Sequence, residues 1–415
     1  MSLKISPGAL FRLATLIIIA LSTFRFVTVN TGRAIDLFCF VSASYAFSHQ
    51  QNPYDTGVLF PLQHRLYDGS HAFVALTGHP LPAQPFYNYP LLAVALRPLI
   101  GLQVAQAYAL YTLVAIVACA GGALLCLKAL GPTGKRASLA GLSFLVASTP
   151  LFICLWYGQL SSLLLGVLGL ALYASSRGRH GLAGGIAALT LVKPHLLLVP
   201  LLLAPLGLGR RDAWRWYAGM CAGGALSALI ICLTIGAWSL TAWVGTLFSF
   251  WQVMHVAQTY IPSLAGTVLL LAPPPWDHRL SLALTGAGLL LMGMIVHQGR
   301  RRALSYPVIL ALLVPVWLLC TPYLHANDYI LAFPALTWVS LQARARAYRW
   351  APALPWALLL CSTTFLTTLP GALLGLLAPL LACAALYCTV RHAPLMTRSP
   401  RPDSAALPRL IVQDT

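Results

Sequence analysis

The sequence predicts an all-α protein, a polytopic bundle of membrane helices. Apolar residues make up 59% of the 415-residue chain and charged residues only 8%, whereas ordinary soluble domains carry about 25% charged residues. The apolar residues stand in long continuous runs of Leu, Ala, Val and Gly, and not in the alternating pattern of barrel strands. Because such a chain cannot cover a water-facing surface, we expect lipid to surround most of it.

The apolar runs predict the individual spans. A spanning helix needs roughly 20 apolar residues, so we expect about 12 spans, some of them short or broken. They are residues 9–30, 103–127, 137–155, 160–176, 181–192, 195–208, 213–237, 280–298, 307–323, 329–343, 351–368 and 371–390. Residues 1–390 are therefore expected to form one integral membrane domain of helices. Residues 391–415, rich in Arg, Pro and Ser, are expected to form a disordered cytoplasmic tail.

Three segments depart from plain spans. The runs 181–192 and 195–208 are separated by Lys193-Pro194-His195, and proline disfavours helical geometry at the residue before it. Non-helical backbone at membrane depth is tolerated where it lines a cavity or packs in protein. Residues 31–102 form a long outer loop in which we expect short helices on the membrane surface. Residues 238–279, with interfacial tryptophans, are expected to form a second such excursion.

The basic residues predict the orientation. The net charge is +18, but the basic residues stand in small clusters between spans, without the aromatic platform of a nucleic-acid-binding protein. With the N-terminus in the cytoplasm, about 20 of the 26 basic residues fall inside, which fits the positive-inside rule. We therefore expect a multi-pass protein of a bacterial-type plasma (inner) membrane, with both termini cytoplasmic and no nucleic-acid partner.

Asp36 is the first candidate for chemistry. All eight acidic residues of the chain are Asp, and Asp36 follows the first expected span among apolar neighbours. An ionisable residue in such a place is a functional candidate, and one role is a general base that takes a proton from an acceptor hydroxyl. The alternative is a salt bridge to Arg33, one helical turn away, that pins the end of the first helix.

Lys193 and His325 are candidates for binding an anion, such as the phosphate of a lipid-linked substrate. The alternative for Lys193 is a side chain that snorkels to the lipid headgroups, and for His325 it is a hydrogen-bonded turn. His325 and Asp328 are three residues apart, so they share one face of a helical turn if a helix forms there.

The other candidates are polar residues near the expected outer boundary. Asn52 and Tyr54 stand in the turn signature Asn52-Pro53-Tyr54-Asp55, for which turn formation alone is the alternative. Gln159 opens the span 160–176 and either points into a cavity or simply ends a helix. Tyr89 is an aromatic anchor of the outer loop.

No metal and no cofactor is expected. The ten cysteines are scattered, mostly inside apolar runs, with no CxxC and no Cys/His metal spacing, so we expect small buried side chains. The outer loop contains four histidines, His49, His64, His71 and His79. No two of them have the spacing by which a helix presents two ligands to one metal ion.

The ordered set of segments resembles glycosyltransferase family 87, integral membrane enzymes of the GT-C type that use polyprenyl-phosphate sugars. Order and spacing carry the resemblance, because no single segment is specific. The segments are Asp36 with Tyr45-Ala46, Asn52-Pro53-Tyr54-Asp55, Phe86-Tyr87-Asn88-Tyr89-Pro90, Trp156-Tyr157-Gly158-Gln159-Leu160-Ser161, Leu191-Val192-Lys193-Pro194-His195 and Thr321-Pro322-Tyr323-Leu324-His325-Ala326-Asn327-Asp328. One departure is Leu91 after Pro90, where the family usually has a second proline.

The resemblance implies inverting transfer of a hexose, typically mannose, from polyprenyl phosphate to a lipid or glycan acceptor on the extracytoplasmic face. Asp36 would be the general base and His325 would lie near the donor phosphate. With them we expect Lys193 and Arg33 at the donor phosphate. The residues expected to bind substrate are Asn52, Tyr54, Tyr89, Gln159 and Asp328. One carboxylate suffices, because the leaving phosphate is already an anion that needs cations and not a protonating acid.

Two other functions compete with this interpretation. A transporter or lipid flippase without transfer activity also has many spans and broken helices. It would carry repeats between its halves, which are absent here, and ionisable residues near the bilayer midplane. A scaffold with a degenerate site is the third hypothesis, and it would be favoured if Asp36 pointed into lipid or away from any cavity.

Overall fold

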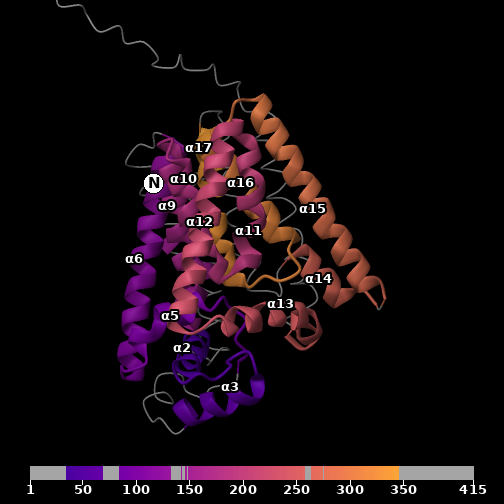
Figure 1. Ribbon diagram of the computed structural model, residues 1–415. Coiled ribbons are helices and arrows are strands. Elements are labelled where there is room, and N and C mark those ends of the chain that lie inside the picture. Colours follow the sequence, from indigo (N-terminus) through magenta and orange to yellow (C-terminus); the bar gives the residue numbers. More distant parts are fainter. Residues whose placement is uncertain are drawn as a thin grey trace, which may run out of the picture.

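The computed structural model describes residues 34–68, 84–131, 142, 145–146, 148–257, 263–273 and 275–344. Every regular element in these ranges is a helix, which confirms the all-α prediction. Among the described residues, three helices are long and apolar enough to cross a membrane, namely α6 (Val104–Leu130), α12 (Arg210–Thr234) and α15 (Trp276–Arg301). In Figure 1, α6 and α15 form two opposite edges of the bundle. The protein is therefore a polytopic helical membrane protein.

The interior of the bundle consists of shorter and broken helices. The directions of α8 (Thr149–Tyr157) and α9 (Ser161–Ser176) differ by 118°, so they form a broken span or a re-entrant pair. The continuous pairs are α10 (His180–Ala187) with η3 (Ala188–Val192), α11 (Pro194–Leu203) with η4 (Ala204–Gly207), and η6 (Ala326–Ala332) with α17 (Phe333–Arg344).

The break expected at Lys193 is confirmed. The backbone of Lys193 is not helical, with φ −143° and ψ 71°, and Pro194 begins α11. Proline is favoured at this first helical position because its missing N–H needs no partner there. The expected spans 9–30, 351–368 and 371–390, part of 137–155, and the tail lie outside the described residues. The expected number of spans therefore stays a prediction.

Helix α16 (Tyr306–Cys320) is the centre of the core, because all its residues are buried. Close packing around it depends on small residues. A Cβ on Gly122 of α6 would clash with the backbone of α9, and a Cβ on Gly219 of α12 would clash with the backbone at Gly181. Such close approach is the usual way in which membrane helices gain contact, because burial of apolar groups gives little when lipid is the solvent.

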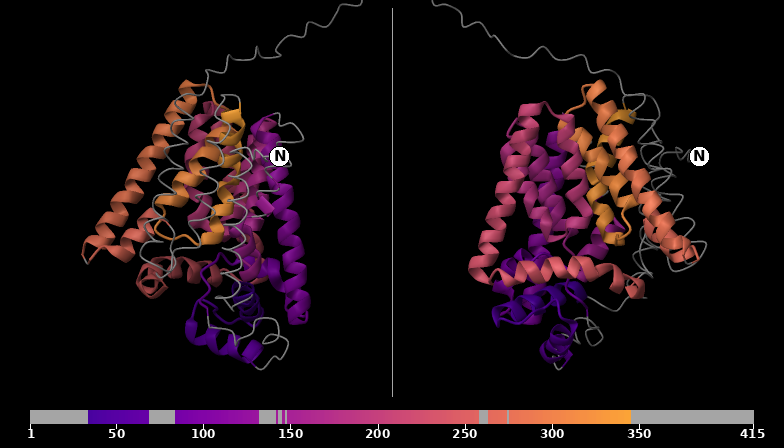
Figure 2. Two further views of the ribbon diagram at one scale, coloured as in Figure 1. Left: turned by 180° about the vertical axis from the view of Figure 1, so that it is seen from behind. Right: turned by 45° about the vertical axis from the view of Figure 1, so that its right-hand side comes forward.

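Short helices gather at one end of the bundle, which we call the α2 end. They are α2 (Ile35–Ser48), α3 (Thr56–Gln63), the π-helical η1 (His64–Asp68), α5 (Leu91–Leu96) and η2 (Arg97–Leu99). Helix α13 (Trp238–Ala257) runs across the long helices at the same end, and α14 (Leu264–Leu271) follows it (Figures 1 and 2). Short helices expected in 31–102 and the excursion expected in 238–279 are thus observed, and their contact with a membrane surface stays a prediction.

Candidate functional site

Three helix breaks bring polar residues together beside α2. They are the α8–α9 break, the η3–α11 break at Lys193, and the segment 321–325 between α16 and η6. Gly158 makes the first break possible, because its φ of +73° is a left-handed conformation that glycine adopts without strain. A Cβ there would lie 2.5 Å from the Cβ of Leu37. The α8–α9 break therefore packs directly on α2, next to Asp36.

A buried ion pair forms the centre of the site. The Nζ of Lys193 lies 2.7 Å from Oδ1 of Asp328, and the two residues are 5% and 0% exposed. Lys193 also donates to Oε1 of Gln159, at 3.2 Å. A buried ion pair persists only when further hydrogen bonds satisfy its atoms.

Asp328 receives those further hydrogen bonds. Its Oδ1 accepts from the hydroxyl of Ser161 and from Nδ2 of Asn327, the latter at 3.0 Å. Its Oδ2 accepts from the backbone N–H of His325 at 2.9 Å, as a cap of η6. Both oxygens of this carboxylate are therefore held in place, and they in turn hold Lys193.

Asp36 lies in the first turn of α2 and is partly exposed. Its carboxylate accepts a side-chain hydrogen bond from Gln159. Burial raises the pKa of Asp36 from 3.8 to about 6, although the Gln159 hydrogen bond and the charge of Lys193 oppose the rise and that of Asp328 adds to it. A carboxylate with such a pKa is a better base than an ordinary aspartate and is still mostly ionised at neutral pH.

The amide of Gln159 thus links the two parts of the site. Its N–H group donates to Asp36 while its oxygen accepts from Lys193. Gln159 is 6% exposed, and its own backbone carbonyl accepts from the Tyr111 hydroxyl at 2.9 Å. The amide is therefore fixed between an anion and a cation, and its orientation is determined by both.

His325 lies beside this cluster with an aromatic partner. Its Nε2 is 2.7 Å from the hydroxyl of Tyr323, whose ring packs edge-on against His195, with 4.8 Å between ring centres. The Nε2 atom of His195 is buried and has no hydrogen-bond partner among the described residues. Both histidines are partly exposed.

The structure brings together five of the predicted residues: Asp36, Gln159, Lys193, His325 and Asp328. Sequence reasoning did not single out Ser161, Asn327, Tyr323 or His195 by role. All four stand inside the segments Trp156-Tyr157-Gly158-Gln159-Leu160-Ser161, Leu191-Val192-Lys193-Pro194-His195 and Thr321-Pro322-Tyr323-Leu324-His325-Ala326-Asn327-Asp328. The sequence signal that could have identified them is that each is a polar residue within two positions of a predicted site residue.

Asn52, Tyr54 and Tyr89 do not join this cluster. Asn52 accepts from the backbone N–H of Tyr54 at 3.1 Å, and the Tyr54 hydroxyl donates to the carbonyl of Asn88 at 2.8 Å. The Tyr89 hydroxyl lies 3.3 Å from that of Ser227. These contacts confirm the expected turn and show how the loop at the α2 end is held. A direct role in substrate binding stays a prediction for all three. Arg33 lies outside the described residues.

The side chains of the Asp36–Gln159–Lys193–Asp328 cluster contact one another. A groove of about 330 Å³ also borders α2, but it is lined by Phe38, Val41 and Tyr45, which lie on a different face of the helix from Asp36. In the part of the chain that the structure describes, no three His, Cys, Asp or Glu side chains gather closely enough to hold a metal ion.

Comparison with curated proteins and with solved structures gives no match. The family model of glycosyltransferase family 87 matches residues 86–322, which is more than half of the 415 residues. This range contains Gln159 and Lys193 and ends three residues before His325, whereas Asp36 precedes it. On this match, together with the all-helical membrane fold, the chain belongs to glycosyltransferase family 87.

Proposed function

We propose that this membrane glycosyltransferase transfers a hexose, mannose in the first instance, from polyprenyl phosphate to a lipid or glycan acceptor, with Asp36 as the general base. The observation that carries the proposal is the position of Asp36. It is a partly exposed carboxylate with a raised pKa, held by Gln159 against the buried cation of Lys193. A base and a cation so close together suit a reaction in which a proton is removed on one side of the sugar and a phosphate is released on its other side.

The proposed reaction balances in one displacement. Asp36 takes the proton of the acceptor hydroxyl, the acceptor oxygen bonds to the anomeric carbon, and the bond from that carbon to the phosphate oxygen breaks. Polyprenyl phosphate leaves with the bonding electrons, and the configuration inverts. Negative charge grows on the phosphate oxygen as the bond breaks, so a fixed cation stabilises the transition state more than the ground state.

Lys193 is the proposed cation at that oxygen. Its ammonium has three N–H donors, and the structure records two acceptors for them among the described residues, on Asp328 and Gln159. A donor phosphate would take the third. His325 is the proposed second contact to the phosphate, and Arg33 the third.

Asp328 supports this arrangement as the partner of Lys193. Because its oxygens already accept from Lys193, Ser161, Asn327 and the backbone of His325, we favour a role in positioning these groups over direct contact with the sugar. Gln159 has a related role, since it orients both Asp36 and Lys193. Asn52, Tyr54 and Tyr89 are proposed contacts to the substrates.

The proposed setting follows from the lipid nature of the substrates. The donor, the acceptor and the surrounding lipids are the partners, no cofactor takes part, and nucleic acid does not bind. We place the enzyme in a bacterial-type plasma membrane with its site on the extracytoplasmic face. A transporter or flippase remains the alternative function, but membership of a glycosyltransferase family favours transfer.

The test is transfer by Asp36→Asn in membranes supplied with polyprenyl-phosphate mannose. Removing a general base typically costs 10²–10⁴-fold in rate, so labelled lipid or glycan product should fall by about that factor. Asp55→Asn is the matched control, because Asp55 caps α3 at the same end of the protein and asparagine caps equally well. Wild-type transfer by Asp36→Asn would remove this residue from the mechanism. Movement of labelled lipid across liposomes without any transfer would support the flippase.

A further inference from the structure

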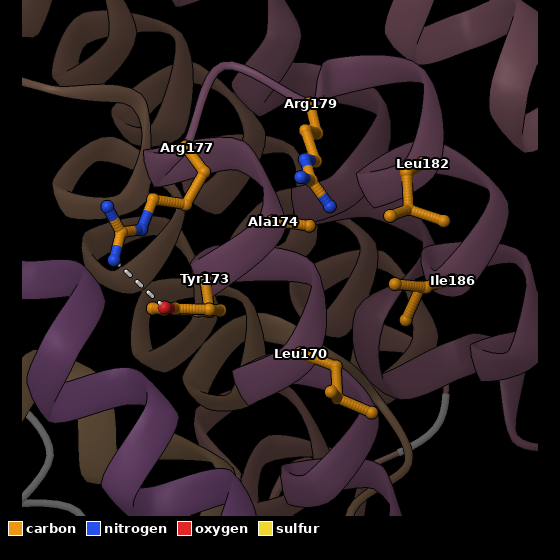
Figure 3. Close-up of a pocket in the computed structure, with 7 residues that line it drawn as sticks. All are labelled: Leu170, Tyr173, Ala174, Arg177, Arg179, Leu182 and Ile186. Carbon is orange, nitrogen blue, oxygen red and sulfur yellow. Dashed lines mark hydrogen bonds between the residues drawn. The ribbon is translucent and has the colours of Figure 1, made fainter.

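A second groove lies far from the site, between α9 and α10. Figure 3 shows the residues that line it. Its volume is about 510 Å³. Helix α9 begins at Ser161, which bonds to Asp328, and ends at Ser176. Sixteen helical residues span roughly 24 Å, so the groove lies at the other end of the bundle from Asp36. Nothing in the proposed reaction uses it.

The walls of this groove change from basic to apolar along its length. Arg177 and Arg179 stand at one end, on the turn that joins the two helices, and both line the groove. In Figure 3 the Arg179 side chain extends on the side of Leu182, whereas the Arg177 side chain extends to the other side, toward Tyr173. Leu170 and Leu182 line the rest and are 47% and 54% exposed. Exposed leucines on a membrane helix are where acyl chains pack, and arginines at its end lie at the depth of the headgroups.

Tyr173 connects the two parts. Its hydroxyl accepts from Arg177 at 3.1 Å, and the guanidinium lies 5.3 Å from the centre of its ring. This contact holds Arg177 beside the groove in one position. A phosphate at this end of the groove would therefore meet one guanidinium whose position is already fixed, and binding would cost less side-chain entropy at that residue.

The arginines have no recorded carboxylate partner in the described ranges. The nearby Asp212 is paired with Arg215, with 3.2 Å between Nη1 and Oδ1. Two cations at the rim of an apolar groove, without an anion of the protein beside them, leave an excess of positive charge that an external anion can neutralise.

We propose that this groove binds an anionic glycerophospholipid, with its phosphate on Arg177 and Arg179 and an acyl chain along Leu170 and Leu182. A free anion would make no use of the apolar wall, and a neutral lipid would make no use of the two arginines. The proposal is independent of the proposed function, because it concerns a different end of the molecule and a lipid that does not react.

The test uses the purified full-length protein and native mass spectrometry. Protein released from nanodiscs of mixed phosphatidylglycerol and phosphatidylcholine should retain phosphatidylglycerol, and R177Q/R179Q should retain roughly 10- to 30-fold less, at about 1 kcal/mol for each basic side chain. The control is R300Q/R301Q, which removes two exposed arginines at the end of α15 that do not line the groove. This variant should retain the lipid as the wild type does.

A second pair of measurements separates a lipid site from a plain anion site. L170A/L182A should weaken retention of long-chain phosphatidylglycerol several-fold and leave binding of its dihexanoyl form unchanged. Inorganic phosphate should not displace the long-chain lipid. Equal retention by R177Q/R179Q and its control would overturn the proposal, as would displacement by inorganic phosphate. Preferential capture of polyprenyl phosphate over phosphatidylglycerol would also overturn it and would assign the groove to the donor lipid.

Discussion

The amide of Gln159 determines the state of the proposed base. It donates to Asp36 and accepts from Lys193, so one side chain transmits the position of a buried cation to a partly exposed carboxylate. Hydrogen bonds to the charged form of an acid lower its pKa, and burial raises it. In Asp36 the effect of burial is larger, and the carboxylate therefore titrates close to the pH at which a base works best.

This balance predicts the pH dependence of transfer. Asp36 with a pKa of about 6 is protonated below that pH and inactive, so the rate should rise as pH increases through about 6. Gln159→Leu removes a contact that lowers the pKa, and the rising limb should therefore move to higher pH. Gln298→Leu, at an exposed position on α15, is the control and should leave the limb in place. If the rising limb of Gln159→Leu stays at the wild-type pH or moves to lower pH, this role of the amide is contradicted.

The ion pair predicts a difference between stability and activity. Lys193→Met leaves Asp328 buried without its cation, which should cost about 3–5 kcal/mol of stability and lower the melting temperature in detergent. Lys193→Met with Asp328→Asn should recover much of that loss, because asparagine carries no charge yet still accepts hydrogen bonds. Transfer should stay low in both variants, since the cation is missing. Recovery of transfer in the double variant would show that Lys193 serves the fold alone.

At the residue scale, the sequence predicted most of the residues of the site but not which of them contact one another. The three-residue spacing of His325 and Asp328 indicated a local contact, and one exists through the backbone N–H of His325. The principal partner of Asp328 is instead Lys193, 135 positions away. Periodicity and motif spacing describe neighbours along the chain, so they could not predict a pair that depends on how three separate helix breaks meet.

At the scale of the elements, the α8–α9 break positions the site, and glycine tests this. Gly158→Ala adds a Cβ that would lie 2.5 Å from the Cβ of Leu37, so α2 and Asp36 must move. Gly178→Ala is the matched control, because Gly178 also has φ +73° but has open space around it. Both variants should lose about 1 kcal/mol to backbone strain, whereas only Gly158→Ala should lose most of its transfer activity. Equal transfer by the two variants would show that the break is not needed.

The elements also show what the sequence could predict. Apolar runs and the Lys193-Pro194 pair predicted the helices and the break within 181–208, because proline acts through local geometry. The boundary near Gly158 was expected, but the 118° change of direction across it was not. That angle depends on the packing of α9 against α6 and of the break against α2, which no local pattern records.

At the scale of the whole molecule, three clusters of arginines lie at the same end of the helix bundle. The turn 177–179 lies near the first turns of α12, because a Cβ on Gly181, just after the turn, would lie 3.5 Å from the carbonyl oxygen of Arg215. Gly207 and Gly299 both lie against Ile309, which places the start of α12 near the end of α15. Three arginine clusters therefore gather at one end, as the positive-inside rule would require of a cytoplasmic face.

This sidedness predicts the topology. A biotin-acceptor tag inserted after Gly209, before α12, should be labelled by a ligase expressed in the cytoplasm. The same tag after Gly236, beyond α12, should not be labelled. Labelling only after Gly236 would place the α2 end inside the cell, and the proposed extracytoplasmic site would then be wrong.

The most direct test of the account measures donor binding and transfer on one purified sample of Asp36→Asn. If Asp36 acts on the acceptor proton while Lys193 and His325 hold the phosphate, this variant should bind polyprenyl-phosphate mannose with a Kd near that of the wild type. Its transfer rate should nevertheless fall by about 10²–10⁴-fold. Transfer at the wild-type rate, with donor binding intact, would contradict the account.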